Sequence, residues 1–327
     1  MVMGWRLKGF DYSRPYYYMV TLRRLEGLSA LSAIVAPGRC EMNAITRAFV
    51  HVIRHFHGRV AGVCPIQCFS VMPDHIHFLI KIAGEVENKT FSFKSEGLTL
   101  GFYVEELMAA LSRAYWEVLA KADDGEAKRV VLAARETKRF APVFFADWHD
   151  WIVKCEGQLA AFTRYIRENP ERSWLRKSHR EYFKRVIALE FLGRTWYGYG
   201  NVKLLDLPML EPFRCSRKWN EGSEEWCAAV ARASRIGPGG AGVSTFMSPC
   251  EKACGHALGL AGGRWIVLSP DGFGERWHPS RQYEKFCAEG RMLFISLWPA
   301  MAREPTKAEL YNRCHQMGDL VVAALTR

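Results

Sequence analysis

The sequence predicts two domains, an antiparallel α+β half followed by a smaller α/β half. A chain of 327 residues is longer than most single domains. In the first half, predicted strands neighbour each other along the chain, which is typical of an antiparallel sheet with helices packed on it. In the second half, strands alternate with helices, which is typical of a parallel sheet. We place the boundary between domains 1–194 and 195–327.

In the first half, aromatic and β-branched runs predict the strands, and apolar residues at helical spacing predict the helices. The strands are expected over residues 16–22, 64–71 and 75–82, the last two joined by Met72-Pro73-Asp74. Helices are expected over 41–57, 103–120 and 158–168. Gly58 would stop the first helix and Asn169-Pro170 the last, because proline disfavours helical geometry in the residue before it. The charged segment 121–139 fits either a helix or a solvated insertion.

The second half begins with GRTWYGYGN, residues 193–201, which we interpret as a linker or domain edge. Residues 237–242, GPGGAG, predict a loop. A helix is expected to open at Ser248-Pro249, and strands are expected over 264–268 and 292–297.

Composition narrows the class of protein. Hydrophobic residues make up 49% of the chain, which is enough for packed cores. The 45 Lys and Arg against 34 Asp and Glu give a net charge of +11, which favours a polyanionic partner such as nucleic acid. The ten cysteines form no C-x-x-C pair, so no zinc ribbon or redox motif is predicted. Neither a signal-like segment nor a long apolar run is present, so we expect a cytoplasmic protein without a membrane partner.

Two histidines stand out in VMPDHIHFLI, residues 71–80. Strand side chains alternate, so His75 and His77 project from one face of the strand. Two neutral imidazoles can bind one metal ion, although a lone H-x-H is more often a hydrogen-bonded core pair. Tyr165 and Asn169 are four residues apart and share a helix face, so an amide oxygen and a phenol could meet the same ion. On spacing alone, Tyr165 is better explained as a core aromatic.

MPDHIHFLI resembles the HUH signature of single-tyrosine transposases, above all the REP-associated tyrosine transposases, whose usual form is MPNHVHLL. YYYMVTLRR resembles the opening strand of that family, and RYIRENPERSWL resembles its nucleophile helix. PVFFADWHDWI resembles the segment between them, and the order holds over residues 10–180. Two features depart from the family: Asp74 replaces an asparagine, and segment 121–139 is longer.

The resemblance implies an α+β HUH endonuclease domain with a ferredoxin-like, RRM-like antiparallel sheet. It implies cleavage and transfer of single-stranded DNA through a covalent 5′-phosphotyrosine on Tyr165. His75, His77 and Asn169 would bind the divalent metal, Mg²⁺ or Mn²⁺. A phenol with a pKa near 10 is a poor nucleophile at neutral pH, and a metal ion that polarises the phosphate would compensate for this.

Basic and aromatic residues are interleaved over residues 164–185, a pattern that suits phosphate contact and base stacking on single-stranded or hairpin DNA. A solvated helix face with core aromatics would give the same pattern. The residues that we expect to bind DNA are Arg23, Arg24, Arg164, Arg167, Arg172, Arg176 and Lys177.

In the second half, SPCEKACGHALGLAGGRWIVL resembles the Rossmann-like core of DNA-processing protein A, and HPSRQYEKFCAEGRMLFISLWP resembles the helix and strand that follow. This resemblance implies DNA or nucleotide binding at the start of the Ser248 helix, where Ser248 and Lys252 would bind a phosphate. Val243 and Phe246 replace the Thr and Glu of the P-G-G-x-G-T-x-x-E motif of related phosphoribohydrolases, so that activity is not expected. The G-x-G-x-x-G fingerprint of dinucleotide enzymes is also missing.

The alternative from another functional class is a hairpin-specific DNA-binding protein that does not cut. The 2H phosphoesterases require two separate H-x-T/S motifs, and the histidine-triad hydrolases require a third histidine where this chain has Leu79. The recognised DNA and the oligomeric state stay open, with a homodimer as the assembly to test.

Overall fold

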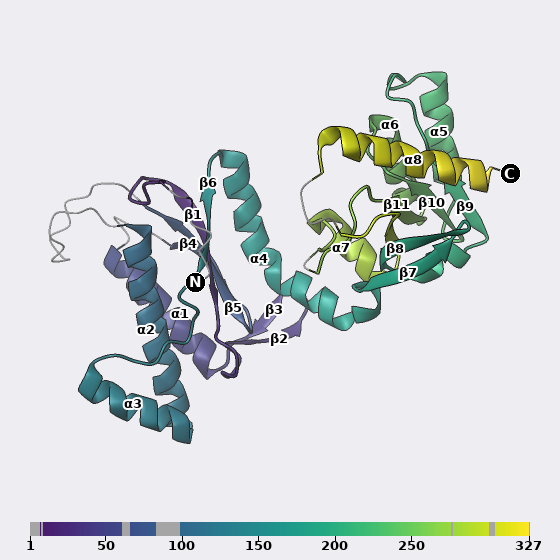
Figure 1. Cartoon of the computed structure of the whole chain (residues 1–327). Coiled ribbons are helices and arrows are strands. Elements are labelled where there is room, and N and C mark those ends of the chain that lie inside the picture. Colours follow the sequence, from purple (N-terminus) through teal and green to yellow (C-terminus); the bar gives the residue numbers. More distant parts are fainter. Residues whose placement is uncertain are drawn as a thin grey trace. The chain divides into compact units, whose positions relative to one another are not determined.

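The computed structural model describes residue 7 and residues 9–60, 66–82, 99–275, 277–300 and 305–326. It divides into two compact units, Met1–Trp174 and Leu175–Arg327, each with a sheet of its own (Figure 1). The architecture is mixed α/β. Among the described residues, no helix is both long enough and apolar enough to cross a membrane.

The first unit is built on a four-stranded antiparallel sheet in the order β4-β5-β1-β6. Its strands are β1 (Tyr17–Arg23), β4 (Ile66–Val71), β5 (His75–Lys81) and β6 (His149–Val153), and a small hairpin is made of β2 (Ala33–Ala36) and β3 (Arg39–Glu41). Its helices are α1 (Ala44–Val60), α2 (Leu100–Lys121), α3 (Gly125–Thr137) and α4 (Glu156–Ser178).

The two faces of this sheet carry different helices because side chains alternate along each strand. Tyr18 and Val20 of β1 and Phe78 of β5 join the main core, which also takes in buried residues of α1 and α2. Leu79, on the opposite face of β5, packs in a smaller cluster with Ile166 of α4. Helix α4 therefore covers the face on which the odd-numbered residues of β5 project.

The second unit holds a six-stranded sheet in the order β7-β8-β12-β11-β10-β9. The four strands β9 (Met209–Pro212), β10 (Gly240–Ser244), β11 (Arg264–Leu268) and β12 (Met292–Ser296) run parallel. The hairpin of β7 (Arg185–Phe191) and β8 (Arg194–Gly200) joins antiparallel to β12. A sheet of this kind needs cover on both faces.

Helices supply that cover. One core includes buried residues of α5 (Glu224–Arg235), α6 (Pro249–Leu260) and α7 (Arg281–Ala288). The core on the other face includes Met317 and Val321 of α8 (Lys307–Leu325) and Leu204 of the 3-10 helix η2 (Val202–Asp206). A further 3-10 helix, η1 (Arg180–Tyr182), precedes β7.

The structure corrects several predicted elements. Residues 193–201, expected as a linker, form β8, and the expected boundary at 194/195 falls inside the β7–β8 hairpin, whereas the compact units meet after Trp174. Helix α1 does not stop at Gly58 but reaches Val60, and most of segment 121–139 is helical. The expected strand start at residues 64–65 lies outside the described residues.

Helix α4 is the most consequential difference, because it continues through Pro170 instead of ending before it. The proline ring removes one backbone N–H and disfavours helical geometry in Asn169. Ile166, Asn169 and Pro170 are all buried, so their packing offsets this local penalty. The continuation brings Arg172 onto the same helix face as Tyr165 and Asn169.

Candidate catalytic site

Four side chains from β5 and α4 converge at one place. His75 and His77 project from β5 toward α4, with their Nε2 atoms 3.1 Å apart. The Asn169 amide nitrogen lies 3.2 Å from His75 Nε2. The Tyr165 ring lies edge-on to the His77 ring, with centroids 5.3 Å apart. The structure therefore brings together the two histidines, the tyrosine and the asparagine that the sequence singled out.

Each imidazole also forms a hydrogen bond through its other ring nitrogen, Nδ1. His75 Nδ1 is 2.8 Å from the Asp74 carboxylate, which can only accept a hydrogen bond, so Nδ1 carries the hydrogen and Nε2 of the neutral ring is an acceptor. His77 Nδ1 is 2.9 Å from the hydroxyl of Thr21, its cross-strand neighbour on β1. Such outer partners fix ring orientation and tautomer. Sequence reasoning missed Thr21, since nothing in the pattern reveals the register of β1 against β5.

Burial keeps His77 neutral. Its pKa is lowered to about 3, mainly by burial and next by the neighbouring His75; Arg172 adds to the shift, while Asp74 opposes it. The side chain is only 5% exposed. A neutral imidazole offers a lone pair at physiological pH, which is the form that binds a metal ion.

Arg172 lies over the ring of Tyr165, with its guanidinium carbon 4.8 Å from the ring centroid. The two residues are seven positions apart, two turns along α4, so they share a face of the helix. Tyr165 is half-buried, with part of its surface open. A permanent positive charge therefore stands beside the phenol. The sequence proposed Arg172 only as one member of a basic stretch.

The spacing of the nitrogen atoms fits a small divalent ion. An octahedral ion with bonds of about 2.1 Å places adjacent ligand atoms about 3.0 Å apart. The Nε2–Nε2 separation of 3.1 Å and the Asn169–His75 separation of 3.2 Å are close to that value. Asn169 presents its oxygen instead of its nitrogen after a half-turn of the amide, which changes no other atom.

The predicted DNA-binding residues have different surroundings. Arg23 is exposed at the end of β1, with its guanidinium carbon 5.5 Å from the Phe145 ring centroid. Arg24 donates to the carbonyl oxygens of Leu25 and Leu28, so its guanidinium stabilises the conformation of the loop that follows β1. Lys177 is exposed.

Arg176 has a structural role that the sequence did not indicate. Its guanidinium forms an ion pair with Glu284 of α7, whose side chain is only 2% exposed. A buried carboxylate without a partner would be strongly destabilising. Arg176 therefore stabilises the fold by neutralising Glu284.

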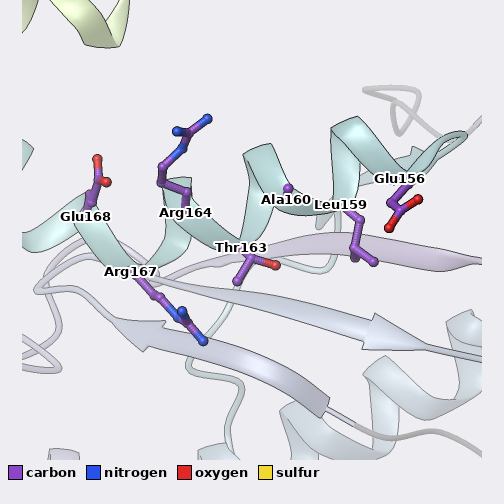
Figure 2. Close-up of a pocket in the computed structure, with 7 residues that line it drawn as sticks. All are labelled: Glu156, Leu159, Ala160, Thr163, Arg164, Arg167 and Glu168. Atoms are coloured by element: carbon purple, nitrogen blue, oxygen red, sulfur yellow. The ribbon is translucent and has the colours of Figure 1, made fainter.

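Arg164 and Arg167 line a hollow of about 570 Å³ along α4. Figure 2 shows Arg167 extending toward the strands and Arg164 extending away from them. Both residues are exposed. The remaining lining residues are Glu156, Leu159, Ala160, Thr163 and Glu168.

The start of α6 at Ser248 carries a carboxylate of the protein itself. Ser248 caps α6, but the carboxylate of Glu251 folds back and accepts from the backbone N–H groups of Met247 (3.0 Å) and Ser248 (3.2 Å) and from the Thr245 hydroxyl (2.9 Å). This is a capping box, in which the carboxylate three residues into the helix accepts from the N-cap backbone N–H. Lys252 is exposed at the next position. The structure does not test the phosphate-binding roles of Ser248 and Lys252, which stay predictions.

No protein-family model and no curated protein matches this chain. Among solved structures, a REP-associated tyrosine transposase bound to a REP hairpin is 10% identical, with a TM-score of 0.30, covering 50% of this chain and 72% of that one. DNA processing protein A from Helicobacter pylori is 17% identical, with a TM-score of 0.30 and coverages of 40% and 63%. The Streptococcus pneumoniae protein of that name is 14% identical, with a TM-score of 0.32 and coverages of 60% and 68%. All three are distant neighbours, and TM-scores of this size establish no common fold for the whole chain.

Proposed function

We propose that this chain is a metal-dependent single-stranded DNA endonuclease and strand transferase that acts through a covalent 5′-phosphotyrosine. The observation that carries the proposal is the convergence of His75, His77 and Asn169 beside the half-buried phenol of Tyr165. A purely structural histidine pair needs no tyrosine and no cation beside it. The HUH-like motifs of the sequence favour the same reaction.

Tyr165 is the proposed nucleophile. Its Oη attacks the scissile phosphorus, the new P–Oη bond forms as the P–O3′ bond breaks, the phenol loses its proton and the leaving 3′-oxygen gains one. The phosphodiester is conserved in the phosphotyrosine, so a 3′-hydroxyl can reverse the step and join strands without a nucleotide cofactor. Arg172, over the tyrosine ring, places positive charge where the attacked phosphate accumulates negative charge.

His75, His77 and Asn169 would hold Mg²⁺ or Mn²⁺, which would act as a Lewis acid on the scissile phosphate. Thr21 and Asp74 would keep both Nε2 atoms turned toward that ion through the outer ring nitrogens. The low pKa of His77 leaves its lone pair available throughout the neutral range.

DNA would reach this site over the exposed basic residues. Arg23, Arg164, Arg167 and Lys177 are the exposed members of the predicted set. In this proposal, the second unit adds DNA affinity and supplies no catalytic group, because the proposed nucleophile and metal ligands all lie in the first unit.

The test is a covalent trapping experiment. Labelled single-stranded and hairpin oligonucleotides are made from inverted repeats that flank the gene and are incubated with the full chain and Mn²⁺ or Mg²⁺. We expect a protein–DNA adduct that survives denaturation. Tyr165→Phe removes only the hydroxyl, so DNA binding should persist while the adduct is lost. His75→Ala and His77→Ala should abolish metal-dependent cutting, and Asn169→Ala should weaken it less, because water can replace a neutral oxygen ligand.

Tyr115→Phe is the matched control. The Tyr115 ring is buried in the core, its hydroxyl donates to the Ser29 carbonyl (3.2 Å), and burial raises its pKa. This variant should keep the adduct. An adduct that persists in Tyr165→Phe would move the nucleophile elsewhere. Binding of the cognate hairpin without any adduct in the wild type would favour the alternative of a DNA-binding protein that does not cut.

A further inference from the structure

Three cysteines of the second unit meet in its core. Cys250 and Cys254 lie one turn apart on α6 and so share a face of that helix. Cys215 lies just beyond β9 and approaches them from a different part of the chain. The three side chains are 1%, 0% and 7% exposed, respectively. Their sulfur atoms all lie within 4.8 Å of one another, and none of them is in a disulfide.

This spacing is close to what a thiolate-bound metal requires. A tetrahedral zinc ion with Zn–S bonds of about 2.3 Å holds its sulfur atoms about 3.8 Å apart. Because 4.8 Å is the upper limit of the observed separations, a contraction of about 1 Å or less would bring all three onto one ion. Thiolates are soft ligands that select zinc over magnesium.

Two local features position the cysteines, and one of them favours a thiolate. Cys250 lies in the first turn of α6, where the positive end of the helix dipole favours a thiolate. The buried carboxylate of Glu251 accepts from the backbone N–H of Cys215 at 3.3 Å, so this hydrogen bond holds the segment that carries Cys215 against α6. The three thiolates would supply three of the four ligands of a tetrahedral zinc ion, and a ligand from outside this group of side chains would complete the site.

We propose that Cys215, Cys250 and Cys254 form a structural zinc site that ties the segment after β9 to the start of α6. The competing explanation is that the three thiols simply pack as small hydrophobic side chains, since buried free cysteines are common. The two explanations differ in whether the protein carries metal. The site is independent of the catalytic proposal, because none of its residues belongs to the first unit.

Zinc content alone cannot identify the site, because His75 and His77 can also bind zinc. Co²⁺ exchanged into the full chain resolves this, since thiolate ligands give an intense near-ultraviolet charge-transfer band that imidazole and amide ligands do not. We expect the wild type, purified under reducing conditions without metal-affinity resin, to contain zinc and to show this band after cobalt exchange. A zinc chelator should lower its Tm, and zinc alone should restore it.

Cys254→Ser replaces a sulfur by an oxygen and should abolish the charge-transfer band. Cys287→Ser is the matched control, since Cys287 is fully buried in the same hydrophobic core but lies outside the triad. It should keep the band at wild-type intensity. If Cys254→Ser does not fold, the chelator and cobalt measurements on the wild type still decide the question. A wild type without the band after cobalt exchange, or a Cys254→Ser variant that keeps it at wild-type intensity, would overturn the zinc site.

Discussion

At the scale of single residues, each imidazole of the candidate site has its Nδ1 atom hydrogen-bonded to an outer residue and its Nε2 atom directed at the other imidazole. Asp74 holds His75 with a carboxylate, and Thr21 holds His77 with a hydroxyl. The two outer partners therefore differ in charge. His77 is the ring that is buried, and a second carboxylate beside it would favour the charged imidazolium that metal binding must exclude. A neutral hydroxyl orients this ring without that effect.

Thr21→Val keeps the shape of the side chain but removes the hydroxyl. We expect it to weaken metal binding by about 10- to 100-fold, because His77 loses the partner that sets its orientation and tautomer. The measurement is the Mn²⁺ concentration that gives half-maximal adduct formation. Thr21→Ser restores a hydroxyl at the same position and should stay close to the wild type. Equal metal requirements for Thr21→Val and the wild type would show that the hydroxyl does not position the ring.

The residues of the candidate site were predictable to different degrees. Strand alternation was enough to place His75 and His77 on one face, and helical spacing was enough to pair Tyr165 with Asn169. Thr21 and the Arg176–Glu284 ion pair were not predictable, because they depend on strand register and on contacts between segments far apart in the chain. The three-cysteine cluster was missed for the same reason, since Cys215 is 35 positions before Cys250.

At the scale of elements, the bounds of the strands that were predicted lie closer to the structure than the ends of the predicted helices. β1, β5 and β11 fall within one residue of their expected bounds, because buried strands have dense apolar and β-branched runs. Pro170 misled the prediction of α4, because a local steric preference was outweighed by burial of the residues around it. β8 was misread as a linker because its glycines suggested a turn, whereas they lie in a paired strand, one of them at a close backbone approach.

Gly200, at the end of β8, is the clearest of these glycines. Its φ is +119°, and an added Cβ would lie 2.6 Å from the carbonyl oxygen of Met292 on β12. Gly200→Ala should therefore lower the free energy of unfolding of the second unit by on the order of 2–3 kcal/mol, since backbone atoms cannot move aside cheaply. Denaturant unfolding of the full chain, followed by tryptophan fluorescence, measures this; the buried Trp196 of β8 is one of the reporters.

Gly198→Ala is the matched control on the same strand. Its Cβ would lie no closer than 3.4 Å to any neighbouring atom, which is ordinary van der Waals contact. Its effect should stay within about 1 kcal/mol. Similar losses in the two variants would mean that the close approach of β8 and β12 is not what requires glycine at position 200.

At the scale of the whole molecule, the chain divides by contacts after Trp174, but α4 extends beyond this point to Ser178. All four central residues of the candidate site lie in the first unit. The division by sequence at 194/195 would instead separate β7 from β8, which are paired along most of their length. A fragment that ended there would carry an unpaired strand, and exposed strand edges promote aggregation.

We therefore expect a fragment of residues 1–179 to fold, to remain soluble and to form the Tyr165 adduct with Mn²⁺ and cognate DNA, whereas a fragment of residues 1–194 should aggregate more readily. Residue 179 follows the last turn of α4, so the helix that positions Tyr165, Asn169 and Arg172 is kept whole. The fragment loses the Glu284 partner of Arg176, but a lone arginine on a helix end is readily solvated.

The DNA affinity of the 1–179 fragment should be lower than that of the full chain, because fewer basic groups contact phosphate. Size-exclusion chromatography, a DNA-binding titration at two salt concentrations and the adduct assay test these points. A 1–179 fragment that folds and binds metal and DNA, yet forms no adduct, would mean that the second unit supplies a group to the reaction.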